Sequence, residues 1–261
     1  MQSNKLSILE HRQVSVRYWH MVVSAQGLTE QIRPGQFFNI LCGNRALPFL
    51  RRPFSIYRIN REEETIEFLY LVQGAGTREM TNMKVGESID LLGPFGIGFT
   101  LDEQWETVLL LARGVGIATL AALAQEAVAQ GKQCIAILSA RSRNDLLAAD
   151  TLQGLGVDVL KVTEEDGNSD VTQVEELIMD ILDKRKIDAG FTCGSKRLSR
   201  LMQKVSINNG FPAQVALEEH MACAMGACFA CVCDIREGDA IKSVRICTEG
   251  PVFDLSKVVM A

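Results

Sequence analysis

Four cysteines near the end of the chain have the spacing of a ligand set for an iron–sulfur cluster. Cys223, Cys228 and Cys231 follow the pattern C-x4-C-x2-C, and Cys247 lies further downstream. Thiolates at this spacing bind a [2Fe-2S] cluster in plant-type ferredoxins. The residues between Cys223 and Cys233 are small or apolar and none is charged, so backbone amides can approach the sulfurs. We therefore predict a [2Fe-2S] cluster bound by Cys223, Cys228, Cys231 and Cys247.

Other uses of these cysteines fit the pattern less well. A structural zinc site usually combines two separated cysteine pairs, whereas three of these cysteines fall between positions 223 and 231. Disulfide frameworks belong to short secreted chains. Cys233 is two residues beyond Cys231 with Val232 between them, and as the spare cysteine we leave it out of the ligand set. Cys247 completes the set because the turn at residues 249–251 could fold it back toward the others.

Two stretches in the first third of the chain could bind a phosphorylated ring system. Residues 51–55 (RRPFS) end a predicted strand, where an arginine can bind phosphate while backbone groups and the hydroxyl of Ser55 hold a ring. Arginine pairs at strand ends are also commonly just solvated. At residues 74–77 (GAGT), glycines let amides approach an anion and Thr77 adds a hydroxyl donor. Taken alone, this second stretch reads as a hairpin turn.

Two further glycine-containing stretches follow predicted strands in the middle of the chain. Gly114 and Gly116 lie between a buried strand and a helix, where free amides and the helix dipole favour a pyrophosphate. The dinucleotide-binding fingerprint has three glycines, and one of them is missing here. The second strand is followed by SARSR and not by the acidic residue of that fingerprint. Tight packing of the strand against the helix therefore explains the two glycines equally well. Cys193 and Gly194 end a late strand that faces the ligand crevice, although a buried thiol is the commoner fate of such a cysteine.

The elements that position these stretches change character along the chain. Residues 1–98 show alternating apolar positions, such as Val14, Val16 and Tyr18, between Gly and Pro turns, which predicts an antiparallel barrel. Residues 99–212 predict a parallel sheet covered on both faces, because strands alternate with helices there. The expected strands are 108–112, 133–140, 157–162 and 187–192, and the expected helices are 117–130, 174–184 and 198–205. Residues 213–261 form a third, cysteine-bearing unit.

Composition narrows the class of protein. The chain has 261 residues, 47% of them hydrophobic and 23% charged, which is ordinary for a globular protein. A net charge of −5 gives no indication of nucleic-acid binding, and no apolar run is long enough to span a membrane. The first residues lack the layout of a signal peptide. We expect a cytoplasmic protein whose eight cysteines serve metal binding rather than disulfides.

Taken together and in this order, these stretches resemble the ferredoxin–NADP reductase superfamily, and more narrowly the electron-transfer subunits of type B dihydroorotate dehydrogenases. The likeness is strongest over residues 217–231 and 247–253. It implies an FAD-binding barrel, an NAD(P)-binding domain and a [2Fe-2S] subdomain. The residues it assigns to FAD are Arg52, Pro53, Phe54, Ser55, Leu69, Tyr70, Leu71, Gly76 and Thr77, and those it assigns to NAD(P) are Gly114, Gly116, Cys193 and Gly194.

The resemblance also implies a function. Such a subunit passes electrons between the FMN of a catalytic partner and NAD(P), through the [2Fe-2S] cluster and FAD, within a heterotetramer. The expected reaction is dihydroorotate oxidation with NAD+ in pyrimidine biosynthesis. The chain departs from the family at Arg113, Thr119 and Ser195, and Arg141 and Arg143 could accept a 2′-phosphate, so NADP(H) stays open. The alternatives are a diaphorase subunit of a hydrogenase or a bifurcating ferredoxin reductase, and a redox sensor.

Overall fold

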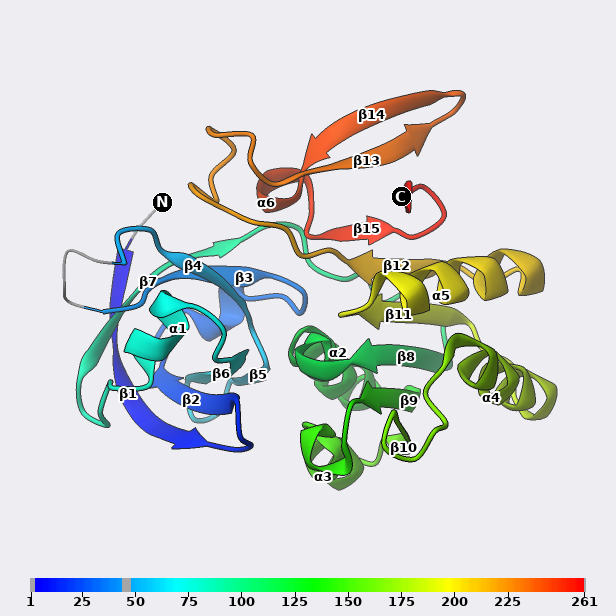
Figure 1. Cartoon of the computed structure of the whole chain (residues 1–261), viewed down its shortest axis with the longest axis horizontal. Coiled ribbons are helices and arrows are strands. Elements are labelled where there is room, and N and C mark those ends of the chain that lie inside the picture. Colours follow the sequence, from blue (N-terminus) through cyan, green and yellow to red (C-terminus); the bar gives the residue numbers. More distant parts are fainter. Residues whose placement is uncertain (1–2, 44–47, 261) are drawn as a thin grey trace.

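The chain folds into a barrel, an α/β domain and a smaller C-terminal unit, as predicted (Figure 1). The structure is a computed structural model, and it describes residues 3–43 and 48–260. In that part of the chain, no helix is both long and apolar enough to cross a membrane.

The barrel is one antiparallel sheet of seven strands with the order β4-β3-β7-β1-β2-β6-β5. Its side chains alternate between core and surface, so that Met21 and Val23 are fully buried while Val22 between them is only partly buried. The strands are β1 (Ser3–Gln13), β2 (Tyr18–Ser24), β3 (Phe37–Leu41), β4 (Arg52–Ser55), β5 (Arg58–Asn60), β6 (Thr65–Leu71) and β7 (Ser88–Phe95).

Two local predictions in the barrel were wrong. Val14 and Val16 belong to the turn between β1 and β2, where the N–H of Tyr18 donates to the carbonyl oxygen of Ser15 and Val16 is 86% exposed. Residues 74–76 do not form a hairpin turn, because Gly74 caps the short helix α1 (Ala75–Met80). In both places the sequence pattern is short, and tertiary contacts decide the conformation.

The α/β domain has a six-stranded sheet with the order β10-β9-β8-β11-β12-β15. All neighbouring pairs are parallel except β12 and β15, which are antiparallel. The strands are β8 (Thr107–Arg113), β9 (Gln133–Ala140), β10 (Asp158–Thr163), β11 (Ala189–Cys193), β12 (Ala213–Ala216) and β15 (Val252–Asp254). The helices are α2 (Ile117–Ala129), α3 (Ala149–Gly154), α4 (Val171–Lys184) and α5 (Lys196–Asn209).

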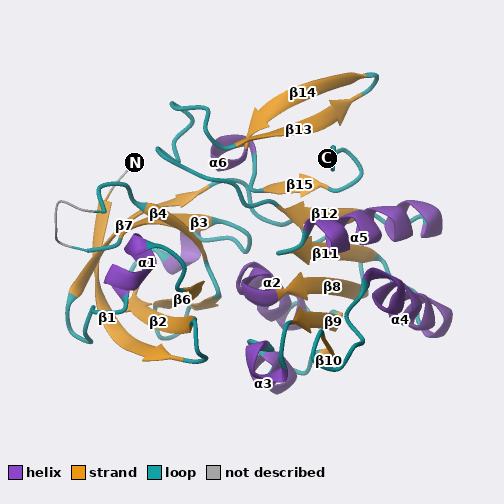
Figure 2. Ribbon diagram, viewed as in Figure 1, coloured by secondary structure: helices purple, strands orange, loops and turns teal. Residues whose placement is uncertain are grey.

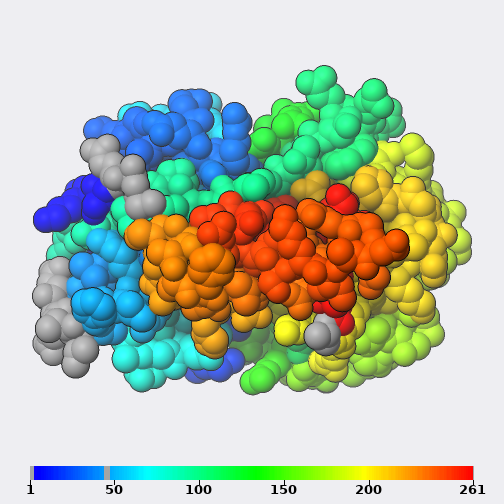
Figure 3. All heavy atoms as spheres, turned by 90° about the horizontal axis from the view of Figure 1, so that it is seen from above, coloured from blue at the N-terminus to red at the C-terminus, as the bar shows by residue number. Residues whose placement is uncertain are grey.

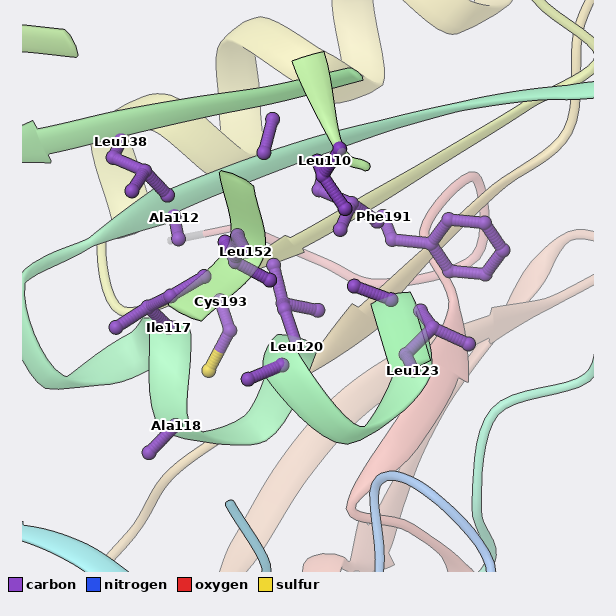
Figure 4. Packing of buried hydrophobic residues seen from close by; sticks show 14 of the residues in the cluster. Leu110, Ala112, Ile117, Ala118, Leu120, Leu123, Leu138, Leu152, Phe191 and Cys193 are labelled. Carbon is purple, nitrogen blue, oxygen red and sulfur yellow. The ribbon is translucent and has the colours of Figure 1, made fainter. Parts of the chain in front are cut away.

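Helices cover both faces of this sheet (Figure 2). Leu110 and Ala112 of β8 pack with α2 and α3, as Figure 4 shows for α2, whereas Leu109 and Leu111 pack with α4 and α5. A strand buried on both faces has to be apolar at successive positions, which explains the continuous run of apolar residues in β8.

The strand order places a ligand crevice between β8 and β11. From β8 the chain moves outward to β9 and β10, then returns to β11 on the other side of β8. The connections after β8 and β11 therefore diverge to opposite faces, and ligands of such sheets bind in the crevice at this point. The carboxyl ends of these strands point toward the barrel (Figure 1).

The barrel and the α/β domain share a packed junction. Tyr18, Tyr57 and Leu69 of the barrel are buried within the core that α2 forms with the sheet, and Ala122 of α2 is buried in the core of the barrel. The side chain of Gln125 donates to the carbonyl oxygen of Ile59 at 2.7 Å and accepts from its N–H at 3.2 Å. The crevice thus lies between two domains whose relative position is fixed by packing.

The C-terminal unit lies across both larger domains (Figure 3). Residues 217–231 form a loop without regular structure, followed by the hairpin β13 (Val232–Glu237) and β14 (Ala240–Arg245) and the helical turn α6 (Ile246–Glu249). The chain then returns through β15 to the edge of the α/β sheet.

Candidate cofactor sites

A cavity of about 580 Å³ lies between the barrel, the start of α2 and the loop at residues 217–221. Every residue predicted for FAD lines it: Arg52, Pro53, Phe54, Ser55, Leu69, Tyr70, Leu71, Gly76 and Thr77. They come from β4, from the end of β6 and from the start of α1, which are separate in sequence. The structure brings these residues together, and their contacts with a flavin stay a prediction.

Local hydrogen bonds shape the end of this cavity that lies at the start of α1. The N–H groups of Gln73 and Gly74 donate to Oγ1 of Thr77, at 2.9 and 3.1 Å, so the start of α1 is tightly wound. A Cβ on Gly76 would lie 3.3 Å from Cγ of Arg52, so glycine leaves room there for the arginine side chain. Arg51 instead forms an ion pair with Asp90 at 3.0 Å. Arg52 is therefore the member of the arginine pair that lines the cavity.

His11 fixes the aromatic wall of the cavity, and sequence reasoning did not assign it a role. Its Nδ1 lies 2.9 Å from the carbonyl oxygen of Met83, which can only accept, so Nδ1 carries the proton and Nε2 accepts from the hydroxyl of Tyr70 at 2.8 Å. Burial lowers the pKa of His11 and raises that of Tyr70, which keeps both groups neutral. The ring of Tyr70 meets that of Phe54 edge to face at 5.6 Å.

A second cavity, of about 520 Å³, opens at the carboxyl ends of the parallel strands. Gly114, Gly116 and Gly194 line it, as the sequence predicted. Its remaining lining residues are Arg17, Tyr18, Leu71, Arg113, Val115, Ala140, Arg141, Asp145, Glu164, Arg197 and Glu218. Leu71, Val115 and Glu218 also line the first cavity, so the two cavities share a wall.

The glycines of the second cavity bring two loops into backbone contact. A Cβ on Gly116 would lie 2.5 Å from the carbonyl oxygen of Cys193, and one on Gly194 would lie 2.9 Å from Cα of Gly116. Gly194 also has a φ of +94°, which favours glycine. These glycines therefore serve close packing of the two loops, and their contacts with a nucleotide stay a prediction.

Cys193, predicted for the nucleotide site, lies behind the cavity wall. It is 1% exposed and packs under the first turns of α2 (Figure 4). Its Sγ is 3.6 Å from Oγ1 of Thr119 and 4.0 Å from Oε1 of Glu218. Burial raises the pKa of the thiol, so it stays protonated. Glu218 opens on both cavities, and desolvation by the surrounding protein raises the pKa of its carboxyl group.

The four predicted cluster ligands approach one another as two pairs. Burial raises the pKa of Cys223, but hydrogen bonds from the N–H groups of Met225, Cys228 and Ala227 and from the Cys228 side chain lower it to about 7. Burial, a hydrogen bond with Cys231 and the charge of Cys231 raise the pKa of Cys247 to about 11. Cys223 thus has Cys228 as its hydrogen-bonding neighbour and Cys247 has Cys231, and Cys223 also lies close enough to Cys247 for its charge to raise the pKa of Cys247.

This pairing fits a two-iron cluster better than a single metal ion. Among residues 3–43 and 48–260, no three His, Cys, Asp or Glu side chains converge on one point that could hold an ion. A structural zinc site needs four ligands around one centre, whereas a [2Fe-2S] cluster has two irons and four cysteine ligands. Cys233 lies on β13 beside Cys231, and burial and the charge of Asp234 raise its pKa to about 11.

The loop that carries the cysteines is folded back on itself. Ala224 and Phe229 have positive φ angles of 57° each, and Gly226 has one of 83°. Non-glycine residues adopt this conformation only where the surroundings stabilise it. A Cβ on Gly226 would lie 3.0 Å from Cγ2 of Thr248, so the loop packs closely on α6, which carries Cys247.

The flavin cavity and the cysteine site are neighbours. Phe37 and Met221 line the 580 Å³ cavity and also pack in the apolar cluster that contains Cys231 and Cys247. The three candidate sites therefore follow one another, from the glycine-lined cavity through the flavin cavity to the cysteines, with shared walls at each step.

Comparisons with known proteins identify relatives of this chain. Residues 218–259 match the protein family described as the iron-sulfur cluster binding domain of dihydroorotate dehydrogenase B. The dihydroorotate dehydrogenase B (NAD(+)), electron transfer subunit of Bacillus cereus (strain B4264) is 31% identical over 265 residues, covering 100% of this chain and 100% of that protein. The protein of the same name from Bacillus anthracis (strain CDC 684 / NRRL 3495) is also 31% identical over 265 residues.

Solved structures share the fold at lower identity. An NADH-dependent reduced ferredoxin-NADP oxidoreductase, described in connection with flavin-based electron bifurcation, matches 98% of this chain and 90% of its own with a TM-score of 0.82 and 24% identity. Ferredoxin-NADP+ reductase from Plasmodium falciparum with 2'P-AMP matches 80% of this chain and 93% of its own, with a TM-score of 0.66 and 14% identity. These similarities confirm the predicted fold.

Proposed function

The chain belongs to the family of electron transfer subunits of dihydroorotate dehydrogenase B, and from this premise we propose that it carries electrons between a partner's flavin and NAD+ during dihydroorotate oxidation in pyrimidine biosynthesis. It is an oxidoreductase subunit whose redox groups are a [2Fe-2S] cluster and FAD. Dihydroorotate itself would react on the partner.

The observation that carries this proposal is the sequence of three adjoining sites. Val115 and Glu218 separate the two cavities, and Phe37 and Met221 separate the flavin cavity from the cysteines. Electron transfer requires neighbouring redox groups in a fixed order, and the packed junction between the barrel and α2 holds that order in place. A set of unrelated binding sites would not need to share walls.

We assign each group to residues that fit it. Arg52 and the start of α1 would hold the phosphates of FAD, while Pro53, Phe54 and Tyr70 would contact its ring system. Gly114, Gly116 and Gly194 would face the pyrophosphate of NAD+. Cys223, Cys228, Cys231 and Cys247 would bind the cluster. When bound, FAD exchanges a hydride with a nicotinamide and single electrons with an iron–sulfur cluster.

Glu218 and Cys193 would act on the nicotinamide end of the site. Glu218 lies on the wall shared by the cavities, where a flavin and a nicotinamide would meet, and desolvation raises the pKa of its carboxyl group. Cys193 supports it from behind at 4.0 Å.

The partner we propose is an FMN-containing catalytic subunit, in a heterotetramer in the cytoplasm. The domain boundaries that we propose are residues 1–98 for the FAD-binding barrel, 99–212 for the NAD-binding domain and 213–261 for the [2Fe-2S] subdomain. The names of the relatives support a partner, because each is named as a subunit of a dehydrogenase.

The proposal is tested on protein purified without oxygen, with its natural partners. We expect FAD, two irons and two sulfides per chain, flavin bands with an iron–sulfur shoulder in the visible spectrum, and a copurifying dihydroorotate-oxidising subunit. Colourless, zinc-loaded protein would overturn the cofactor assignment. A hydrogenase or ferredoxin-reducing partner would favour a diaphorase subunit, and absence of NADH:dye reductase activity would favour a redox sensor.

A further inference from the structure

Glu164 lines the second cavity near the end of β9, although β9 itself does not end in an acidic residue. In dinucleotide-binding folds, an Asp or Glu near the end of the second strand hydrogen-bonds the ribose 2′-hydroxyl of NAD, and an arginine there accommodates the 2′-phosphate of NADP. Here the second strand, β9, ends with Ser139 and Ala140 and is followed by Arg141. The structure brings Glu164 to this place from the end of the third strand, β10.

Backbone hydrogen bonds fix the position of Glu164. Its N–H donates to the carbonyl oxygen of Ala140 at 3.1 Å, and the N–H of Glu165 donates to that of Arg141 at 3.0 Å. The chain after β10 therefore runs beside the chain after β9. Both Ala140 and Glu164 line the cavity.

Arg113, at the end of β8, holds the carboxylate of Glu164 in this position. Its Nη2 pairs with Oε1 of Glu164, and its Nη1 donates to Oγ of Ser139 at 2.7 Å. The side chain of Arg113 is 17% exposed and that of Glu164 is 52% exposed. One face of the carboxylate is thus engaged by the arginine, while the side chain stays accessible from the cavity.

The direction of a bound dinucleotide follows from the shared wall. On the proposed function, the nicotinamide lies where the two cavities meet, at Leu71, Val115 and Glu218. The pyrophosphate then crosses the glycines after β8 and β11, and the adenosine end extends toward β9 and β10. We propose that Glu164 selects NAD(H) over NADP(H), by accepting a hydrogen bond from the adenosine ribose and repelling a 2′-phosphate. This inference rests on the proposed function.

Carboxylates already engage two of the arginines near Glu164. Arg143, one of the two arginines considered for that role, is paired with Asp166 at 2.9 Å and does not line the cavity. Arg113 is already paired with Glu164. Asp145 adds a second carboxylate at this end of the cavity, where Ser15 and Ser142 donate to it. Arg141 lines the cavity together with Arg17 and Arg197, so the proposed selection depends on the carboxylate of Glu164 at the ribose and not on the net charge of the cavity.

The test measures binding without turnover. Dissociation constants of NAD+ and NADP+ are determined by calorimetry on the oxidised holoprotein, for the wild type, Glu164→Gln and Glu165→Gln. Glu165 is a matched control, because it is adjacent and accepts from the N–H of Arg143 at 3.0 Å but does not line the cavity. We expect the wild type to prefer NAD+, Glu164→Gln to reduce that preference by about tenfold, and Glu165→Gln to preserve it.

The outcomes separate this inference from the proposed function. A wild type that prefers NADP+, an unchanged preference in Glu164→Gln, or equal losses of both affinities in that variant would each overturn the selecting role of Glu164. A wild type that binds neither nucleotide would instead count against the proposed function. The visible spectrum of each variant reports whether the holoprotein is intact.

Discussion

At the scale of single residues, the thiols of the predicted cluster site differ in pKa. Cys223 accepts several N–H groups and has its pKa lowered to about 7, whereas the pKa of Cys247, at the other end of the predicted ligand set, is raised to about 11. A thiol that is easily ionised is the better metal ligand. The backbone of the loop therefore prepares one end of the ligand set before any iron arrives.

We predict different outcomes for two cysteine substitutions. Cys228→Ser should lose the cluster, since it removes one member of the pair formed with Cys223. Cys233→Ser should retain it, because Cys233 belongs to neither pair. Iron and sulfide content, with the electron paramagnetic resonance signal of the reduced protein, measures both. Loss of the signal in Cys233→Ser would show that the ligand set is wrong.

A second prediction concerns Gly194. Gly194→Ala should weaken NAD+ binding by about tenfold or more, because a Cβ there meets the backbone of Arg113 and Gly116 and displaces the loop. Gly210→Ala is the control, since Gly210 also has a positive φ, +72°, but has no atom within 4 Å of the added Cβ. Gly210→Ala should lose about 1–2 kcal/mol of stability from its positive φ alone, and Gly194→Ala should lose more because of the added backbone clash. Equal NAD+ affinities in the two variants would contradict the loop-packing argument.

At the scale of elements, Asp188 joins the starts of two central strands. It precedes β11, and its Oδ2 accepts from the N–H groups of Glu106 and Thr107, at 2.9 and 3.0 Å, where β8 begins. The hydrogen bond from Lys186, then the bond from Thr107, lower the pKa of Asp188 to about 2. The carboxylate thus accepts hydrogen bonds from two backbone N–H groups at the start of β8 and ties them to the start of β11.

This geometry predicts a pH dependence of stability. A carboxyl group with a lowered folded pKa stabilises the protein above its unfolded pKa of about 4, and that contribution disappears as the pH falls from about 4 to about 2. Asp188→Asn should cost about 1–2 kcal/mol at pH 7 and much less near pH 2. Urea unfolding at both pH values measures the difference.

The control for Asp188 is an exposed ion pair of similar composition. Asp158 pairs with Arg185 at 3.0 Å, and both side chains are about half exposed, at 50% and 49%. Asp158→Asn should change stability by less than about 1 kcal/mol at either pH. If it matched Asp188→Asn, the strand-joining role of Asp188 would be rejected.

The sequence predicts elements well where the pattern is long and poorly where it is short. The apolar run of β8 and the 3.6-residue period of α4 are each long enough to identify the element. Helix α1 has six residues, and with its cap Gly74 its start reads Gly-Ala-Gly, a pattern typical of turns, so it was missed. The residues around the flavin cavity were predicted through family motifs. The contacts of His11 with Tyr70 and of Arg113 with Glu164 were not predicted, because they join residues far apart in sequence.

At the scale of the whole molecule, the junction between the domains should make unfolding cooperative. Tyr18 and Tyr57 are buried in the core of the neighbouring domain, and Gln125 bonds both backbone groups of Ile59. The separation of either domain would expose these groups to water. We therefore expect the barrel and the α/β domain to unfold in one transition.

The two tryptophans of the chain offer a direct measurement. Trp19 lies in β2 of the barrel, and Trp105 packs against Phe191 of the α/β domain. Trp19→Phe and Trp105→Phe each leave one fluorescent reporter per molecule. The urea midpoints of the two variants should coincide with those from circular dichroism, and two separated transitions would show that the junction is weak.

The wall formed by Phe37 and Met221 has a consequence for how the protein matures. These two residues line the cavity proposed for flavin and also pack with Cys231 and Cys247, so we expect loss of the cluster to loosen that wall and weaken the retention of flavin. Protein made under iron shortage would then also contain less bound flavin. An oxidative lesion at Cys228, which is exposed, would disable both centres in a single event.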